Sequence, residues 1–143
     1  MKKSASVVWQ GSIKEGQGLI STQTGVLEDA PYGFKSRFED GPGTNPEELL
    51  GAAHAACFSM ALSLILGGAG HAPESIETDA SVYLRRTDDG FEIHKIELET
   101  VGNVPGIDED EFKRHAETAK RGCPVSRALA AVPDVSLEAR LAG

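Results

Sequence analysis

The chain has 143 residues, enough for one domain with a hydrophobic core, and its hydrophobic and charged fractions of 40% and 25% are ordinary for a soluble protein. Its formal net charge is −8, and Lys and Arg form no run longer than a pair. This composition disfavours binding to nucleic acid or to an anionic membrane surface, because both need clustered cations. No linker, repeat or low-complexity segment is visible, so we expect a single domain over residues 1–143.

The N-terminal region predicts short strands separated by turns. The expected strands are Ser4–Trp9, Gln17–Gln23 and Phe34–Phe38, and the expected turns lie at Gly11, Gly25 and Pro31–Gly33. Met1–Lys3 is basic, but no apolar segment of a secretory signal follows it. We therefore expect a cytoplasmic protein.

A long central helix is predicted from Pro46 to the glycines at 67 and 68. Asn45 is suited to cap the helix, Pro46 fits its first position, and Glu48 is placed to complete a capping box. The stretch Leu49–Ala69 carries no acidic or basic charge and has about the length of a membrane span. It lacks flanking Lys and Arg, so a helix buried on all sides in a soluble protein explains it better.

The C-terminal half predicts a hairpin, two helices and a last strand. The expected elements are strands Ser75–Arg86 and Phe91–Gly102 around the turn Asp88–Gly90, helix Asp108–Arg121, a short helix from Cys123 to near Ala131, and strand Val135–Leu141. The expected buried face of the hairpin is Val82, Leu84, Ile93, Ile96 and Leu98. The order of elements predicts an α+β fold with a largely antiparallel sheet.

Cys57 and Cys123 are the only cysteines, and they lie on different predicted elements. If the fold brings them together, they form either a structural disulfide or a redox site, and a cytoplasmic location favours redox chemistry. Cys57 is equally well explained as a small buried hydrophobic residue. Cys123 opens a predicted helix between Gly122 and Pro124, where backbone N–H groups often surround reactive sulfurs.

A reactive cysteine needs a lowered pKa, and Arg37, the helix start at Cys123 and His54 could each provide it. His54 is better interpreted as a hydrogen-bonded core residue, and the Cys and His spacing does not favour zinc. Arg37 and Glu47 could be solvated charges. Aromatic residues around Arg37, however, favour a bidentate carboxylate partner for its guanidinium.

Helix geometry constrains how these residues can meet. Glu47 and Cys57 are ten residues apart, which is about 15 Å along a continuous helix. Glu47 therefore cannot touch its own Cys57. If Arg37, Glu47 and Cys57 share a site, the simplest solution is a homodimer with adjacent central helices. Small residues would allow the close approach, namely Gly51, Ala52, Ala53, Ala55 and Ala56.

Several segments together resemble the OsmC (osmotically inducible protein C) and organic hydroperoxide resistance family. The matching segments are Pro31–Phe34, Arg37–Phe38, Gly43–Leu49, Ala53–Leu62, Val104–Ile107 and Gly122–Ser126. They are spread over residues 31–126, which is most of the chain, in the family's order. The position of Arg37 shortly before the central helix is typical of the OsmC branch.

This resemblance implies an intertwined homodimer that acts as a cofactor-free, metal-free cysteine peroxidase. It assigns Cys57 as the peroxidatic cysteine, Cys123 as the resolving cysteine, Arg37 as the arginine beside the thiolate and Glu47 as the carboxylate partner of Arg37. It also implies an organic hydroperoxide substrate, with hydrogen peroxide as a further candidate, and a dithiol or dihydrolipoyl reductant.

Two other functions fit the residues less well. One is a non-catalytic stress-protection or small-molecule-binding dimer whose cysteines are structural and unreactive. The other is a hydrolase built on Cys57 and His54, which lacks an evident orienting acid and oxyanion hole and leaves Cys123 without a role.

Overall fold

The structure is a computed structural model that describes residues 1–143. The chain forms two compact units, a first unit of Met1–Leu49 and a second unit of Leu50–Gly143. The long helix α2 begins in the first unit and continues into the second. Each unit has its own three-stranded sheet.

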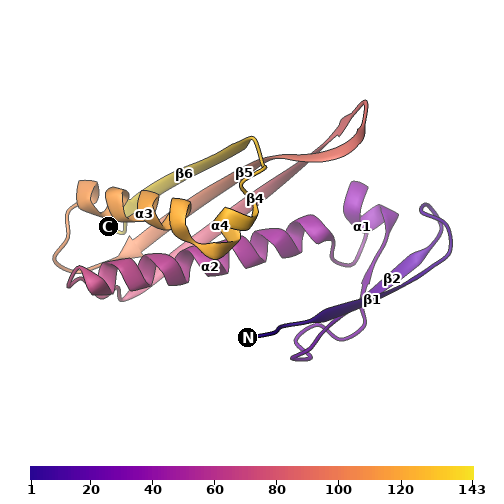
Figure 1. Cartoon of the computed structure of the whole chain (residues 1–143), viewed down its shortest axis with the longest axis horizontal. Helices are drawn as coiled ribbons and strands as arrows, with labels where there is room; N and C mark the ends of the chain where they lie inside the picture. Colours follow the sequence, from indigo (N-terminus) through magenta and orange to yellow (C-terminus); the bar gives the residue numbers. More distant parts are fainter. The chain divides into compact units, whose positions relative to one another are not determined.

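The first unit contains an antiparallel sheet and a one-turn helix (Figure 1). Its elements are β1 (Ala5–Gln10), β2 (Gln17–Thr22), β3 (Ala30–Tyr32) and α1 (Phe34–Phe38). The first two predicted strands are confirmed, but the prediction of a strand at Phe34–Phe38 was wrong. That segment is helical, and the predicted turn around Pro31 is an edge strand.

Local hydrogen bonds explain this difference. The N–H of Gly33 donates to Oγ of Ser36 at 2.9 Å, and that hydroxyl donates to the Gly33 carbonyl at 3.1 Å, which closes one helical turn. Pro31 lies in β3, a short strand at the edge of the sheet. An edge position tolerates proline because its missing N–H is not needed for a second strand.

Helix α2 (Pro46–Gly68) starts where the sequence predicts. Oδ1 of Asn45 accepts the N–H of Glu48 at 2.8 Å, so Asn45 is the N-cap. The expected capping box is incomplete, because the Glu48 carboxylate accepts instead from the hydroxyl of Thr44 at 2.7 Å. The Asn45 amide also donates to the Ser36 carbonyl at 3.0 Å, which ties the helix start to α1.

The C-terminus of α2 is a Schellman motif centred on a glycine beyond the helix. Gly70 has φ +86°, its N–H donates to the Gly67 carbonyl at 3.1 Å, and the N–H of His71 donates to the Leu66 carbonyl at 2.8 Å. The predicted stop at residues 67 and 68 is confirmed. The residue whose conformation ends the helix is Gly70, however, because the left-handed region favours glycine.

The second unit packs helices on one face of a mixed sheet (Figure 1). Its remaining elements are β4 (Ser75–Thr87), β5 (Gly90–Asn103), α3 (Glu109–Gly122), α4 (Pro124–Ala128) and β6 (Asp134–Leu141). The hairpin β4–β5 is antiparallel, and β6 pairs parallel with β5 after a crossover through α3 and α4. All these elements were predicted, but α4 ends earlier than expected.

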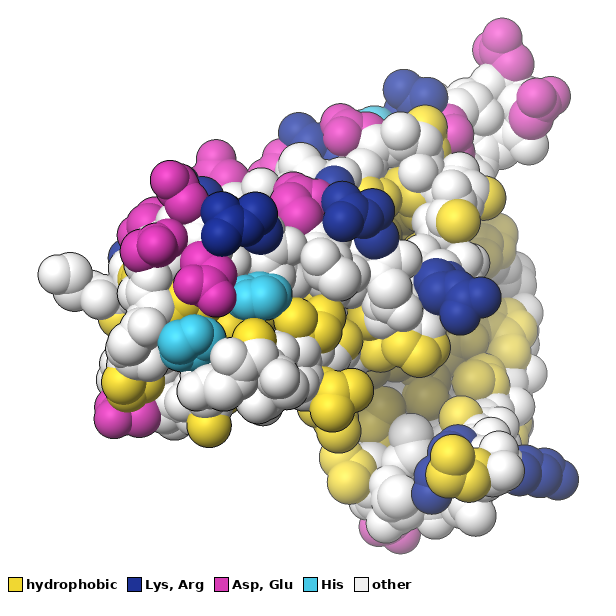
Figure 2. Space-filling model, turned by 60° about the vertical axis from the view of Figure 1, so that its left-hand side comes forward, with side chains coloured by type: hydrophobic (Ala, Val, Ile, Leu, Met, Phe, Trp, Pro, Cys, Tyr) yellow, Lys and Arg dark blue, Asp and Glu magenta, His cyan; other side chains and the backbone are white.

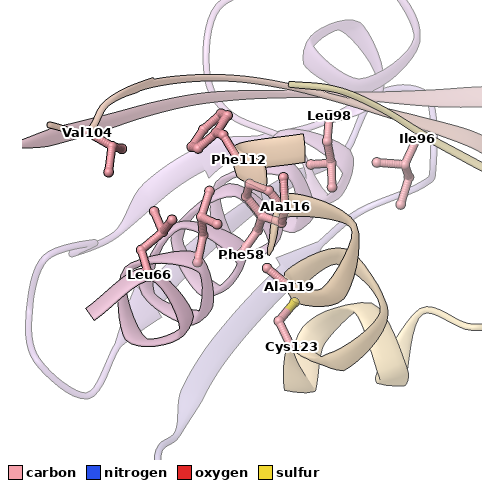
Figure 3. Close-up of a cluster of buried hydrophobic side chains, with 10 residues drawn as sticks. Phe58, Leu66, Ile96, Leu98, Val104, Phe112, Ala116, Ala119 and Cys123 are labelled. Atoms are coloured by element: carbon pink, nitrogen blue, oxygen red, sulfur yellow. The ribbon is translucent and has the colours of Figure 1, made fainter. Parts of the chain in front are cut away.

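The core of the second unit joins α2, β5, α3 and the start of α4 (Figure 3). Its buried members are Phe58, Leu62, Leu66, Ile96, Leu98, Val104, Phe112, Ala116, Ala119 and Cys123. Of the expected hairpin face, Ile96 and Leu98 are fully buried, and Val82 and Ile93 pack against them while partly exposed. Cys123 is thus a core residue at the junction of α3 and α4, and Cys57 of α2 packs against this core while partly exposed.

Helix α2 is long and apolar enough to span a membrane by length and composition. One of its faces belongs to the core of the second unit, which is typical of a core helix. The prediction that α2 is buried on all sides was wrong for a single chain, because Met60 and Leu64 are 77% and 78% exposed. Figure 2 likewise shows hydrophobic side chains exposed next to a surface rich in charges of both signs.

Candidate active site

The first unit holds Arg37 and Glu47 as an ion pair. Nη2 of Arg37 donates to Oε1 of Glu47 at 2.8 Å, and Nε lies 3.2 and 3.3 Å from the two carboxylate oxygens. Glu47 is 7% exposed, whereas the Arg37 side chain is about one-third exposed. This confirms that Arg37 has a bidentate carboxylate partner.

The local fold fixes the direction of the guanidinium. Arg37 lies on α1 and Glu47 lies in the first turn of α2, so the capped start of α2 places the carboxylate. The Arg37 guanidinium carbon lies 5.3 Å from the centre of the Phe38 ring, which packs against Phe34 at 5.0 Å. Nη1 makes no hydrogen bond within the chain, so it remains available to a ligand or another side chain.

The second unit brings the two cysteines together as free thiols. Cys123 is buried, and its Sγ–H donates to Oγ of Ser126 at 3.0 Å while the sulfur accepts the N–H of Ser126 at 3.3 Å. Cys57 is partly exposed on α2 and packs against the core that contains Cys123, close enough for the Cys123 side chain and the Val125 backbone to shift the pKa of its thiol. Two residues 66 positions apart in sequence are thus neighbours in the fold.

The surroundings of Cys57 within the second unit raise the pKa of its thiol. Burial has the largest effect, and the hydrogen bond and charge of Cys123 raise the pKa further. Only the backbone N–H of Val125 acts in the opposite direction. The expected lowering of this pKa is therefore not observed in the second unit.

His54 is a buried core histidine, as predicted from the sequence. Its side chain is fully buried, and Nε2 lies 2.7 Å from Oγ of Ser126. Burial lowers the pKa of His54, so the neutral imidazole is favoured. The histidine contacts the serine hydroxyl and not Cys57, which removes the geometric basis of a Cys57–His54 hydrolase.

Ser126 was missed by the reasoning from sequence, although it belongs to the segment Gly122–Ser126. A serine three residues after a helix-opening cysteine lies one turn later, where its N–H and hydroxyl can both reach the sulfur. The spacing Cys123–Ser126 was the available signal. Arg37 and Glu47 meet in the first unit, and Cys57 and Cys123 meet in the second.

Comparison with known proteins identifies the family. The model of the OsmC-like protein family matches residues 39–138. The peroxiredoxin OsmC of Escherichia coli strain K12 is 54% identical to this chain over 139 residues, which cover 97% of this chain and 96% of the relative. The chain belongs to the OsmC family.

Other related proteins are similar to this chain in sequence and in fold. The organic hydroperoxide resistance protein OhrB of Bacillus subtilis strain 168 is 33% identical over 85% of this chain and 88% of its own. The crystal structure of OhrB has a TM-score of 0.69 and 26% identity, covering 97% of this chain and 98% of that chain. A Legionella pneumophila OsmC structure has a TM-score of 0.74 at 24% identity, covering 96% of each chain.

These matches confirm the expected OsmC-like α+β fold and the resemblance on which the expected activity depends. The sheets and the long central helix are those of an OsmC-family chain. The name of the E. coli relative describes a peroxiredoxin, and that of OhrB describes resistance to organic hydroperoxides.

Proposed function

We propose that this OsmC-family chain reduces organic hydroperoxides through a Cys57 sulfenic acid and a Cys57–Cys123 disulfide. The enzyme class follows from the family and from the 54% identical peroxiredoxin. The chain is a thiol-dependent peroxidase. The observation that carries the finer proposal is the proximity of two free thiols, Cys57 of α2 and Cys123 at the start of α4.

The chemistry takes place in three balanced steps. The Cys57 thiolate attacks the O–O bond of the hydroperoxide, the O–O bond breaks, and the leaving alkoxide takes a proton from solvent, which gives an alcohol and a Cys57 sulfenic acid. The Cys123 thiol then attacks the Cys57 sulfur, so that an S–S bond forms, the S–O bond breaks and water leaves. A dithiol reduces the disulfide by exchange through a mixed disulfide.

Arg37 and Glu47 are proposed to supply a positive charge to the Cys57 thiol. A guanidinium beside the Cys57 sulfur would stabilise the thiolate and hydrogen-bond the peroxide oxygens. Glu47 would hold the guanidinium in one orientation through their paired hydrogen bonds. Nη1 of Arg37, which has no partner in the chain, is the donor available for this role.

We propose that the site is completed in a homodimer. Glu47 and Cys57 lie ten residues apart on the continuous helix α2, so the ion pair of one chain would serve the thiols of another. The exposed residues Ala53, Ala56, Met60 and Leu64 recur at spacings of three and four along α2. Such spacing places them on one face, which forms an apolar stripe suited to a second copy.

The substrate and the reductant are proposed from the family. The names of the relatives support organic hydroperoxides, and exposed apolar surface beside the site would favour them over hydrogen peroxide. A dihydrolipoyl protein or another dithiol is the proposed reductant, and the proposed location is the cytoplasm. A non-catalytic dimer with inert cysteines is disfavoured by membership of a peroxidase family.

Steady-state turnover tests this function directly. Cumene hydroperoxide and hydrogen peroxide are each supplied with dihydrolipoamide, thioredoxin or glutathione. We expect the fastest turnover with cumene hydroperoxide and dihydrolipoamide, and no turnover by Cys57→Ser. Cys123→Ser should consume about one equivalent of peroxide and then over-oxidise. Undiminished turnover by Cys57→Ser would refute the proposal.

A further inference from the structure

A continuous set of hydrogen bonds leads from the resolving thiol to a buried imidazole. Sγ of Cys123 donates to Oγ of Ser126 at 3.0 Å, and this oxygen lies 2.7 Å from Nε2 of His54. The three residues come from the junction of α3 and α4, from α4 itself and from α2. All three belong to the second unit.

These contacts allow an arrangement of hydrogens in which each donor faces an acceptor. In this arrangement the Ser126 oxygen accepts the hydrogen of the Cys123 thiol and donates its own hydrogen to His54. Nε2 of His54 is then the acceptor nitrogen, and Nδ1 carries the ring hydrogen. Each donor therefore faces an acceptor in the order thiol, hydroxyl, imidazole, which is the order needed to remove a proton from the thiol.

His54 is fully buried, and its Nδ1 has no hydrogen-bond partner, as is also true of Nδ1 of His94 and Nε2 of His115. Burial also lowers the pKa of His54, so a proton accepted there is readily released.

His54 borders a pocket whose charged lining residues, apart from His54 itself, are all cations. This pocket of about 460 Å³ is lined by His54 and Ser126 together with Lys120 and Arg121 of α3 and Arg127 of α4. No carboxylate lines this pocket. The pocket gives the released proton a route to solvent.

We propose that Ser126 and His54 form a proton relay that activates Cys123 for disulfide formation. This inference rests on the proposed role of Cys123 as the resolving cysteine. Ser126 is the catalytic residue that touches the reacting sulfur, and His54 is a positioning residue that acts through Ser126.

The relay removes the Cys123 proton in the second step of the reaction, in which the disulfide forms. As Cys123 attacks the Cys57 sulfenic acid, its proton passes to Oγ of Ser126, and the serine hydrogen passes to Nε2 of His54. The S–S bond forms while the S–O bond of the sulfenic acid breaks. Hydroxide leaves Cys57 and takes up a proton to become water, and the imidazolium returns its proton to solvent. The Cys123 sulfur is oxidised and the Cys57 sulfur is reduced.

Single-turnover kinetics tests the relay. The reduced enzyme is mixed with one equivalent of cumene hydroperoxide, and quenched samples are assayed by mass spectrometry for thiol, trapped sulfenic acid and disulfide. In Ser126→Ala and His54→Gln we expect an unchanged rate of sulfenic acid formation. The rate of disulfide formation should fall at least about tenfold near pH 7, the lower end of what proton transfer contributes.

The pH profile separates a relay from a structural role. With the relay intact, disulfide formation should be nearly constant between about pH 6 and pH 8, because neutral imidazole is always available. Without it, the rate should rise with pH, because only the thiolate present in bulk equilibrium attacks. Ser126→Thr keeps a hydroxyl and should restore both the rate and the flat profile.

Two matched substitutions serve as controls. Ser59→Ala removes a hydroxyl on α2 that bonds Thr78 at 2.8 Å, and His94→Gln removes an imidazole of β5 that packs on Tyr83. Neither should change disulfide formation. Because His54 is fully buried, the half-buried Ser126 provides the decisive variant if His54→Gln does not fold.

Three outcomes would overturn the relay. Wild-type disulfide kinetics in Ser126→Ala would show that the hydroxyl is not needed. A slower step with an unchanged pH profile would indicate a structural role only. If the wild-type enzyme consumes peroxide without ever forming a Cys57–Cys123 disulfide, the proposed function itself fails, and this result is distinguishable because it appears before any variant is made.

Discussion

The guanidinium of Arg37 donates to both carboxylate oxygens of Glu47, and the shortest of these contacts is 2.8 Å. The carboxylate is almost fully buried, whereas the guanidinium is partly exposed and keeps Nη1 free of partners within the chain. An arrangement of this kind holds the cation in one plane and presents its remaining donors outward. The pair therefore presents a positive charge in a fixed orientation. We propose that this charge binds the Cys57 thiolate and the peroxide.

Glu47→Gln should impair peroxide reduction more than it impairs folding. The substitution removes the charged partner that orients Arg37, so the proposed stabilisation of the Cys57 thiolate should weaken. We expect the second-order rate constant with cumene hydroperoxide to fall about tenfold or more, equivalent to about 1.4 kcal/mol. The free energy of unfolding should fall by only about 1 kcal/mol, because the arginine is partly solvated. Stopped-flow kinetics and urea denaturation measure the two effects.

Glu48→Gln is the matched control for this prediction. Glu48 is the next residue in the same helical turn, but its carboxylate accepts from Thr44 and does not contact Arg37. Its substitution should leave the rate constant unchanged. If both variants lost the same fraction of the rate constant, the acidic residues would act only by stabilising the start of α2. The orientation of Arg37 would then not affect peroxide reduction.

Cys123→Ala should make Cys57 more acidic. Burial raises the pKa of the Cys57 thiol, and the hydrogen bond and charge of Cys123 raise it further, so removing Cys123 should lower it. The alkylation rate of Cys57 by iodoacetamide should then rise severalfold at a fixed pH below its midpoint, and the midpoint should move to lower pH. Mass spectrometry of the reduced enzyme across a pH series measures this change.

Cys123→Ser is the companion variant, because its hydroxyl retains a polar group beside Cys57. An alkylation midpoint between those of the wild type and Cys123→Ala is expected. A midpoint that stays at the wild-type value in both variants would mean that the two thiols do not interact in solution. That result would contradict the contact on which the proposed disulfide depends.

Gly102→Ala should destabilise the second unit through a clash with Phe112. A Cβ at residue 102 would lie 2.5 Å from the ring of Phe112, which is fully buried in the core. Overpacking of this kind costs about 1–3 kcal/mol. Thermal denaturation at matched protein concentration measures the loss. Combining Gly102→Ala with Phe112→Leu should cost less than the sum of the single substitutions, because the clash is relieved.

Gly122→Ala is the control for this prediction. Gly122 ends α3, and a Cβ at this position would meet no atom within 4 Å. Alanine is the better helix former, so this substitution should be neutral or should stabilise the protein by up to about 1 kcal/mol. If both glycine substitutions had the same effect, the close approach of Phe112 to the sheet would not be the cause.

Much of the fold follows from local signals that the sequence displays. The capping residue Asn45 correctly predicts the start of α2. The acidic first turn and basic last turn of α3 likewise predict that helix correctly, because these charges suit the helix dipole. The segment Phe34–Phe38 was misassigned because its two phenylalanines favour a strand, whereas a single hydroxyl at Ser36 closes a helical turn. Such a one-turn helix has no periodicity to detect.

The candidate site was only partly predictable for a similar reason. The residues of the two pairs carry chemistry that is recognisable in the sequence, namely a cation with a carboxylate and two thiols. Ser126 and Val125 act on the thiols through a hydroxyl and a backbone N–H, which depend on where α4 begins. The exposure of one face of α2 was also not predictable. Beyond its first turn the helix has no charged residues, so the sequence does not distinguish a face that packs on the core from one that is exposed in the single chain.

Met60→Asp with Leu64→Asp should separate the proposed dimer and abolish turnover. Both side chains are exposed in the single chain, on the apolar stripe of α2, so charges there should oppose contact between two copies without disturbing the core. Sedimentation at micromolar concentration should show a monomer with less than about a tenth of the wild-type rate. Val26→Asp changes a similarly exposed residue between β2 and β3. This control should leave the oligomeric state and the turnover rate unchanged. An active wild-type monomer would remove the argument that a second copy completes the site.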